Sequence, residues 1–432
     1  MSAIKNIFAR EIVDSRGTPT VEVEVFLEKF SSLASVPSGA STGTYEAHEL
    51  RDEDKNRFFG KGVTKAVDLI NSEINETIQG MKITDQSLID TTLINLDGTH
   101  NKSRLGANSI LAVSLACAKA AAKFLNLPLF SYIGGISTSL PTPLMNIVNG
   151  GCHSNNKLDF QEFMIIPLGF SSFKDSLRAG CEVFHCLKNL LNKNSFSISV
   201  GDEGGFAPDF SSNKQCLDFI INAIEKSGYK PGQEIYIGLD VASSEFFDGK
   251  KYKLGSESLE LSSQDIIRYY QNLIENYPII SIEDGLDEND WDGWSEMTQE
   301  IGKKCQLVGD DLFVTSTERL KTGLEKKSGN SILIKLNQIG TLTETIETIN
   351  LAKKNNFNTI ISHRSGETED TFISDLSVGI DSGQIKTGSL SRSERISKYN
   401  QLLRIEDRNP SIRFSGNIPF QKFLNVKKNK EL

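Results

Sequence analysis

Five short apolar runs in the second half of the chain each end in an ionisable residue. In chain order these residues are Asp240, Glu283, Asp310, Lys335 and Lys386. A sixth apolar run, ending before His363, lies between the last two, and the six positions are then 43, 27, 25, 28 and 23 residues apart. This spacing is close to the roughly 30 residues that one strand, one return helix and two loops require. Ionisable residues that end successive parallel strands converge at the C-terminal face of a β/α barrel, where such folds carry their active sites. The pattern therefore predicts an α/β barrel with carboxylates and amines at its mouth.

Length and composition narrow the class of protein further. The chain has 432 residues, more than one ordinary core accommodates, so we expect two domains. Hydrophobic residues make up 38% and charged residues 24%, as in a globular enzyme. A net charge of −9 argues against a nucleic-acid partner, and a phosphorylated substrate would need cations gathered locally.

Targeting signals and cysteines point to the cytoplasm. No apolar run approaches the ~20 residues that span a bilayer, and the first residues lack the apolar core of a signal peptide. The six cysteines form no Cys-x-x-Cys pair, so we interpret them as reduced thiols. We therefore expect a cytoplasmic protein without a membrane span.

The first third of the chain has an α+β pattern. Residues 20–27 alternate apolar and acidic side chains, which predicts a half-buried strand, and residues 4–13 are expected to pair with it as a hairpin. Helical patterns follow at 61–80 and 103–125, the second rich in Ala and Leu as in a buried helix. Gly and Pro residues near position 135 predict a boundary between an N-terminal domain, 1–134, and a barrel, 135–432.

The three acids offer only oxygen ligands, with no Cys or His partner at the spacing of a zinc site. Such sets favour Mg²⁺, Mn²⁺ or Ca²⁺ over zinc. The alternative is that Asp240, Glu283 and Asp310 each cap the helix after their strand, which is a frequent role for Asp. For one acid alone capping is the better interpretation, but three on successive strands favour a metal site.

Lys335 ends an all-apolar strand, so its amine is expected at the mouth of the barrel. Burial, a second cation such as Lys386 and a nearby metal would each lower its pKa, which would make it a usable base near neutral pH. The alternative is a structural ion pair between Lys335 and one of the acids, an arrangement that is compatible with catalysis.

Other candidate groups lie in loops. Arg364 stands among small residues after another apolar run, which suits binding of a phosphate or carboxylate. Glu203 lies in a Gly-rich turn, and Glu162 is a second acid in a nearby motif. Clustered carboxylates raise one another's pKa, so one of these acids could serve as a proton donor. The small-residue loop 37–43 is either a lid that closes over an anion or a surface linker.

Ten segments in this order resemble the enolase family over nearly the full chain, in a form typical of bacterial members. They are residues 9–21, 37–43, 146–151, 161–164, 201–208, 281–284, 309–312, 333–341, 362–370 and 384–388. The resemblance implies a small α+β domain before a TIM-like barrel of enolase type, whose first two strands are adjacent and antiparallel. It also implies the hydro-lyase reaction of glycolysis and gluconeogenesis, the reversible dehydration of 2-phospho-D-glycerate to phosphoenolpyruvate.

The resemblance implies two Mg²⁺ ions per active site, the second bound together with the substrate. A Lys or His base working with one or two Mg²⁺ ions is a known feature of the superfamily. Matched by motif, the ligands of the first ion are Asp240, Glu283 and Asp310, and Ser41 completes the second site.

The motifs also imply roles in proton transfer and substrate binding. Lys335 is the implied base at C2, and Glu203 the implied proton donor at C3. The implied catalytic and substrate-binding residues beside them are His153, Gln161, Glu162, His363, Arg364, Ser365 and Lys386, with phosphate at Arg364 and Ser365 and the substrate carboxylate at Lys386.

The family implies a homo-oligomer, either a dimer or an octamer built from dimers, and a possible secondary cell-surface or secreted pool. Two alternatives remain open: another reaction of the superfamily, or a non-catalytic surface binding protein. The complete set of catalytic residues argues against the latter. The sequence departs from the family pattern at Ser389 to Ser391 and at Cys152, without replacing a catalytic group.

Overall fold

The N-terminal part of the chain is built on a three-stranded antiparallel sheet. The structure, a computed structural model, describes residues 2–40 and 43–428. Strands β1 (Asn6–Val13), β2 (Pro19–Phe26) and β3 (Ser31–Ser35) pair in chain order. The side chain of Asp14 accepts hydrogen bonds from the backbone N–H groups of Arg16 and Thr18 at 2.8 and 2.9 Å, which closes the β1–β2 turn. The predicted hairpin is confirmed.

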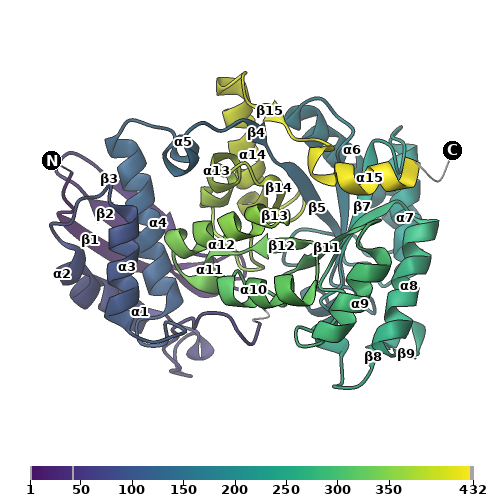
Figure 1. Cartoon of the computed structure of the whole chain (residues 1–432), viewed down its shortest axis with the longest axis horizontal. Helices are drawn as coiled ribbons and strands as arrows, with labels where there is room; N and C mark the ends of the chain where they lie inside the picture. Colours follow the sequence, from purple (N-terminus) through teal and green to yellow (C-terminus); the bar gives the residue numbers. More distant parts are fainter. Residues whose placement is uncertain (1, 41–42, 429–432) are drawn as a thin grey trace.

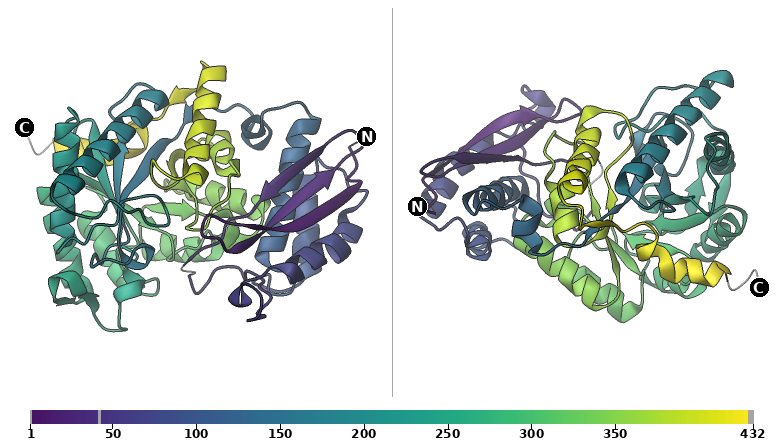
Figure 2. Two further views of the ribbon diagram at one scale, coloured as in Figure 1. Left: turned by 180° about the vertical axis from the view of Figure 1, so that it is seen from behind. Right: turned by 90° about the horizontal axis from the view of Figure 1, so that it is seen from above.

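Helices cover one face of this sheet and leave the other open (Figure 2). The principal one, α4 (Ala107–Phe124), packs against β2 and β3 and is buried along most of its length, as its Ala-rich sequence predicts. The predicted helix over 61–80 corresponds to α1 (Thr64–Leu69), a π-helical turn and α2 (Asn75–Ile78). Helices α3 (Gln86–Asp97) and α5 (Leu129–Gly134) complete this part of the fold.

The rest of the chain forms a closed eight-stranded barrel, shown beside the N-terminal sheet in Figure 1. Its strands are β5 (Thr142–Asn149), β6 (Glu162–Pro167), β7 (Ile235–Asp240), β10 (Ile279–Glu283), β11 (Gln306–Gly309), β12 (Ser331–Ile334), β13 (Asn358–Ser362) and β14 (Gly383–Lys386). The barrel closes where β14 pairs with β5. The predicted fold class, an α/β barrel preceded by an α+β domain, is confirmed.

One strand of the barrel runs against the others. β6 is antiparallel to both β5 and β7, whereas the remaining neighbours pair in parallel. An antiparallel strand begins at the end of the sheet where its neighbours finish. Glu162, the first residue of β6, therefore lies opposite Asp240, the last residue of β7. The reversal brings a carboxyl group to the barrel mouth from the start of a strand.

Helices surround the barrel, and most begin at a residue whose side chain accepts a hydrogen bond from the first turn. The major ones are α6 (Phe173–Lys193), α7 (Asn213–Lys226), α8 (Ser263–Asn276), α9 (Trp291–Ile301), α10 (Thr317–Lys326), α12 (Leu342–Lys354), α13 (Phe372–Gly379) and α14 (Ser393–Arg408). The helices after β7, β10 and β11 are capped by Ser262, Asp290 and Ser316. The strand-end acids are therefore not helix caps. In the described part of the chain, no helix has the length and apolarity needed to cross a membrane.

Candidate active site

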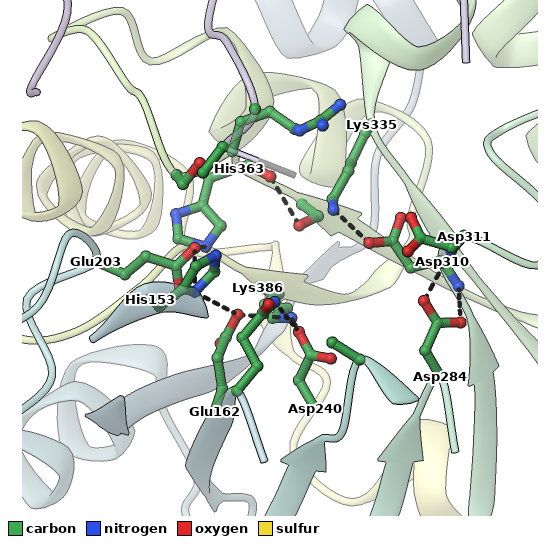
Figure 3. Close-up of a pocket in the computed structure, with 17 residues that line it drawn as sticks. His153, Glu162, Glu203, Asp240, Asp284, Asp310, Asp311, Lys335, His363 and Lys386 are labelled. Atoms are coloured by element: carbon green, nitrogen blue, oxygen red, sulfur yellow. Dashed lines mark hydrogen bonds and ion pairs between the residues drawn. The ribbon is translucent and has the colours of Figure 1, made fainter. Parts of the chain in front are cut away.

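A pocket at the barrel mouth brings most of the predicted site residues together (Figure 3). Its lining includes His153, Gln161, Glu162, Glu203, Asp240, Asp310, Lys335, His363, Arg364, Ser365 and Lys386. Glu283 is buried at the end of β10 and reaches the same cluster through Lys386. Ser41, the remaining predicted residue, lies outside the described residues. Because parallel strands end at one face, residues far apart in sequence converge here.

Lys386 is the centre of the buried carboxylate cluster. Its Nζ lies 2.7 Å from Glu283 Oε1, 2.8 Å from Asp240 Oδ2 and 3.1 Å from Glu162 Oε1, and the side chain is 2% exposed. Burial alone would lower the pKa of Lys386, but these carboxylates raise it well above its usual range. The amine therefore stays charged and neutralises the acids.

Lys335 forms an ion pair with Asp310 Oδ2 on the other side of the pocket. Burial lowers the pKa of Lys335, but the carboxylates around it, Asp310 first and Glu283 after it, together raise it more, and the net pKa is raised. Burial and Lys386 act in the predicted direction, but the net direction is opposite to the expectation, because the nearest charge is an anion rather than a cation. The alternative of a structural ion pair describes this contact correctly.

Glu162 and Glu203 form a coupled pair on the wall opposite Lys335. Atoms of His153 and of both carboxyl groups lie within 4.8 Å of one another. Burial and the Glu203 carboxylate raise the pKa of Glu162 well above its usual range, so the proton of the pair resides on Glu162. Glu203 acts as an acceptor, since the Asn146 side-chain amide donates to its Oε2 at 3.0 Å.

The predicted anion-binding loop, residues 362–366, begins at the last residue of β13. Both terminal nitrogens of Arg364 donate to the carboxylate of Glu46, at 2.9 and 3.1 Å, and both side chains are almost fully buried. The loop is joined to the N-terminal domain by reciprocal backbone hydrogen bonds of 2.9 Å between Ser38 and Gly366. Arg16 extends this junction, donating to Ser365 Oγ at 3.3 Å. Residues 37–40 therefore sit against the predicted phosphate site.

A further acidic group lies next to Asp310. Oxygens of Asp284, Asp310 and Asp311 come within 4.8 Å of one another. Asp284 accepts hydrogen bonds from the backbone N–H groups of Asp310 and Asp311, at 2.9 and 2.8 Å. Burial and the neighbouring acids raise the pKa of Asp284 well above its usual range and that of Asp311 to about 8. Sequence reasoning missed both, although each directly follows a predicted ligand.

The donor set at the mouth fits a hard divalent cation. The predicted ligands are carboxylates from three adjacent strands, and oxygen donors of this kind suit Mg²⁺. Among the described residues, however, only Asp310 of the three belongs to an acidic group whose oxygens lie within 4.8 Å of one another, and its companions there are Asp284 and Asp311. One oxygen, Oε2 of Glu283, is buried and has no hydrogen-bond partner within residues 2–40 and 43–428. A buried carboxylate oxygen without a donor is costly, and a bound cation would satisfy it.

Sequence reasoning also missed Glu46, Asn146 and Arg395, which contact the predicted residues directly. Asn146 and Arg395 lie in or near the motif segments, but their side-chain directions are not readable from the pattern. Glu46 lies in a polar stretch of the N-terminal domain, and nothing in its local sequence indicates contact with a barrel loop.

Together the barrel, its reversed strand and the charged groups at its mouth define the class of β/α-barrel enzymes. Two family models match the chain: "Enolase, C-terminal TIM barrel domain" over residues 137–421 and "Enolase, N-terminal domain" over residues 4–133. The chain belongs to the enolase family, and its site is that of an enolase-superfamily enzyme.

Proposed function

We propose that this chain catalyses the reversible dehydration of 2-phospho-D-glycerate to phosphoenolpyruvate and water. The observation that carries the proposal is the arrangement around one pocket of a lysine, a carboxyl pair and an arginine loop. Lys335 and Glu203 lie on opposite sides of this pocket in Figure 3, as an elimination that removes a proton and a hydroxyl from neighbouring carbons requires.

Binding of the substrate uses its two anionic groups. Arg364 and Ser365 are the proposed phosphate ligands, because a guanidinium and a neighbouring hydroxyl both donate to phosphate oxygens. Both terminal nitrogens of Arg364 already contact Glu46, so phosphate would share or replace these hydrogen bonds. Lys386 is the proposed partner of the substrate carboxylate. Its charge is already shared among three protein carboxylates, so it orients the substrate within a balanced cluster rather than adding an isolated positive charge.

In the proposed reaction Lys335 Nζ takes the C2 proton. The electron pair of the C2–H bond becomes the C2–C3 double bond, and the C3 hydroxyl leaves as water with a proton from Glu203, which must first take up the one proton of the Glu162–Glu203 pair. Lys335 must be neutral to accept a proton, and the Asp310 ion pair opposes this. Mg²⁺ held by Asp240, Glu283 and Asp310 would neutralise these acids and stabilise the negative charge that develops on the substrate carboxylate.

The test is the ultraviolet absorbance rise that accompanies phosphoenolpyruvate formation from 2-phosphoglycerate. We expect a rise with Mg²⁺, none with excess chelator, and none with Lys335→Ala. Lys102→Ala is the matched control, since Lys102 is a buried lysine paired with Glu344 away from the pocket, and it should retain turnover. No rise from folded, Mg²⁺-supplied protein would refute the proposal in favour of another superfamily reaction or a binding role.

Family membership also supports a cytoplasmic homo-oligomer as a proposal. The open face of the N-terminal sheet exposes a cross-strand row in which Phe8 and Leu33 flank Glu24. Exposed apolar side chains on a sheet face favour association. Sedimentation at micromolar concentration tests this, and a monomer would contradict it.

A further inference from the structure

A buried arginine behind the pocket takes no part in the steps proposed above. Arg395 lies in the first turn of α14 and is fully buried. Arginine keeps its charge in proteins and is rarely buried without a partner. Its contact with a carboxylate is loose, 3.5 Å from Nε to Glu394 Oε1, and within the described residues Nε makes no hydrogen bond. The charge must therefore be held by other groups.

Those groups belong to two separate walls of the pocket. Arg395 Nη1 donates to the backbone carbonyl of Arg364 at 2.6 Å, and Nη2 donates to that of Ser365 and, at 3.2 Å, to that of Asp202. Asp202 precedes Glu203, whereas Arg364 and Ser365 form the anion-binding loop. One planar guanidinium thus joins the turn that carries the acid to the loop proposed to hold phosphate.

The same guanidinium also contacts the imidazole of His363. Nη1 of Arg395 meets Nδ1 of His363. A guanidinium has donors and no acceptor, so Nδ1 must accept and cannot carry a proton. The proton of a neutral imidazole is then on Nε2, and Nε2 lies 3.4 Å from Oε1 of Glu203. Figure 3 shows this edge of His363 turned towards Glu203.

The surroundings of His363 keep its ring neutral. Burial lowers its pKa well below the usual range. Glu203 acts in the opposite direction, but the positive charges of Arg395, Lys386 and Lys335 lower the pKa further. A neutral ring with its proton on Nε2 turns that N–H towards the Glu203 carboxylate, although at 3.4 Å Nε2 makes no hydrogen bond within the described residues.

We propose that Arg395 is a positioning residue that holds His363 as the Nε2–H tautomer and fixes the Glu203 turn against the Arg364–Ser365 loop. The catalytic consequence rests on the proposed function, since it requires Glu203 to act in proton transfer. The tautomer itself is a property of the free protein.

Nuclear magnetic resonance of protein labelled with ¹⁵N-histidine tests the tautomer directly. Two-bond couplings distinguish Nδ1–H from Nε2–H rings, and His363→Gln assigns the signal among the five histidines. We expect Nε2–H in the wild type and an increased Nδ1–H population in Arg395→Met. Arg392→Met is the matched control, because Arg392 directly precedes the same helix and contacts Glu394 and Ser15 instead of His363.

Measurement of enzyme activity is the second test of this proposal. Arg395→Lys keeps the charge, but one ammonium cannot span the three carbonyls and the imidazole, so kcat should fall roughly 10- to 100-fold through misplacement of the acid. Arg392→Lys should stay near the wild-type value. Two results would overturn the proposal: an Nδ1–H ring in the wild type, or an unchanged tautomer in folded Arg395→Met. If Arg395→Met does not fold, the wild-type histidine spectrum and the kcat of Arg395→Lys still test the proposal. A wild type without turnover would refute the proposed function alone, because the spectra need no substrate.

Discussion

Replacing Lys386 by Met tests the electrostatic balance of the pocket most sharply. Its Nζ contacts Glu283 at 2.7 Å, Asp240 at 2.8 Å and Glu162 at 3.1 Å, all of them buried. Met fills a similar volume without charge, so the substitution leaves the acids uncompensated. Removing one partner of a buried ion pair typically costs about 3–5 kcal/mol. We expect a loss of this order in the free energy of unfolding when chelator is present.

The loss should depend on pH with a definite sign. Burial raises the pKa of both Glu162 and Glu283, and Lys386 is a charge that lowers them, so Met raises them further. A carboxyl with a raised pKa holds a proton in the native state that the unfolded chain releases. By linkage, stability then falls as pH rises, by about 1.36 kcal/mol per pH unit for each such proton. The deficit of Lys386→Met should be smallest near the usual glutamate pKa and should grow towards neutral pH.

The assay is urea unfolding followed by circular dichroism from about pH 5 to about pH 8, with and without Mg²⁺. Lys102→Met is the control, because Lys102 is also buried but pairs with one carboxylate, the partly exposed Glu344, at 2.9 Å. Lys102→Met should lose less stability than Lys386→Met, and its free energy of unfolding should not fall steeply as pH rises. Mg²⁺ should restore the stability of Lys386→Met only. Equal stability of Lys386→Met and wild type across this range, or a deficit that shrinks as pH rises, would refute the reasoning.

Other positions give simpler tests. Ser389 Oγ is buried without a hydrogen-bond partner in the described structure, so Ser389→Ala should raise the free energy of unfolding by about 1 kcal/mol, and a loss in urea unfolding would contradict this. Burial and the Glu245 carboxylate raise the pKa of Cys152 to about 11, so maleimide labelling should be slow at neutral pH and faster in Glu245→Gln; equal rates would count against that contact. A Cβ on Gly134 would lie 1.5 Å from the carbonyl oxygen of Gly379, so Gly134→Ala should cost about 3 kcal/mol, and a wild-type melting temperature would show that these segments separate freely.

Local sequence patterns predict much of the architecture. The alternation in β2 and the apolar strands that end in Asp240, Glu283, Lys335 and Lys386 predict both the barrel and the composition of its mouth. They do so because side-chain periodicity and burial act over a few residues. The same logic predicts that Arg364 lies near the two lysines, and all three side chains line one pocket.

The direction of strand β6 and the partners of the charged side chains were decided by the tertiary structure. The reversal of β6 puts Glu162 opposite Asp240, and no feature within the strand itself specifies that direction. Glu46 reaches Arg364 from the other domain, across more than three hundred residues of sequence.

The sequence by itself determined which charged groups are available and on which strand ends they stand. Only the tertiary structure decided how they balance: Lys335 faces Asp310, so its pKa rises rather than falls, and Arg395 fixes the tautomer of His363. The physical reason is that interactions between buried charges depend on through-space separations of a few ångströms in a medium of low dielectric constant. Such separations are set when distant segments pack together, whereas strand and helix patterns are set by neighbours along the chain.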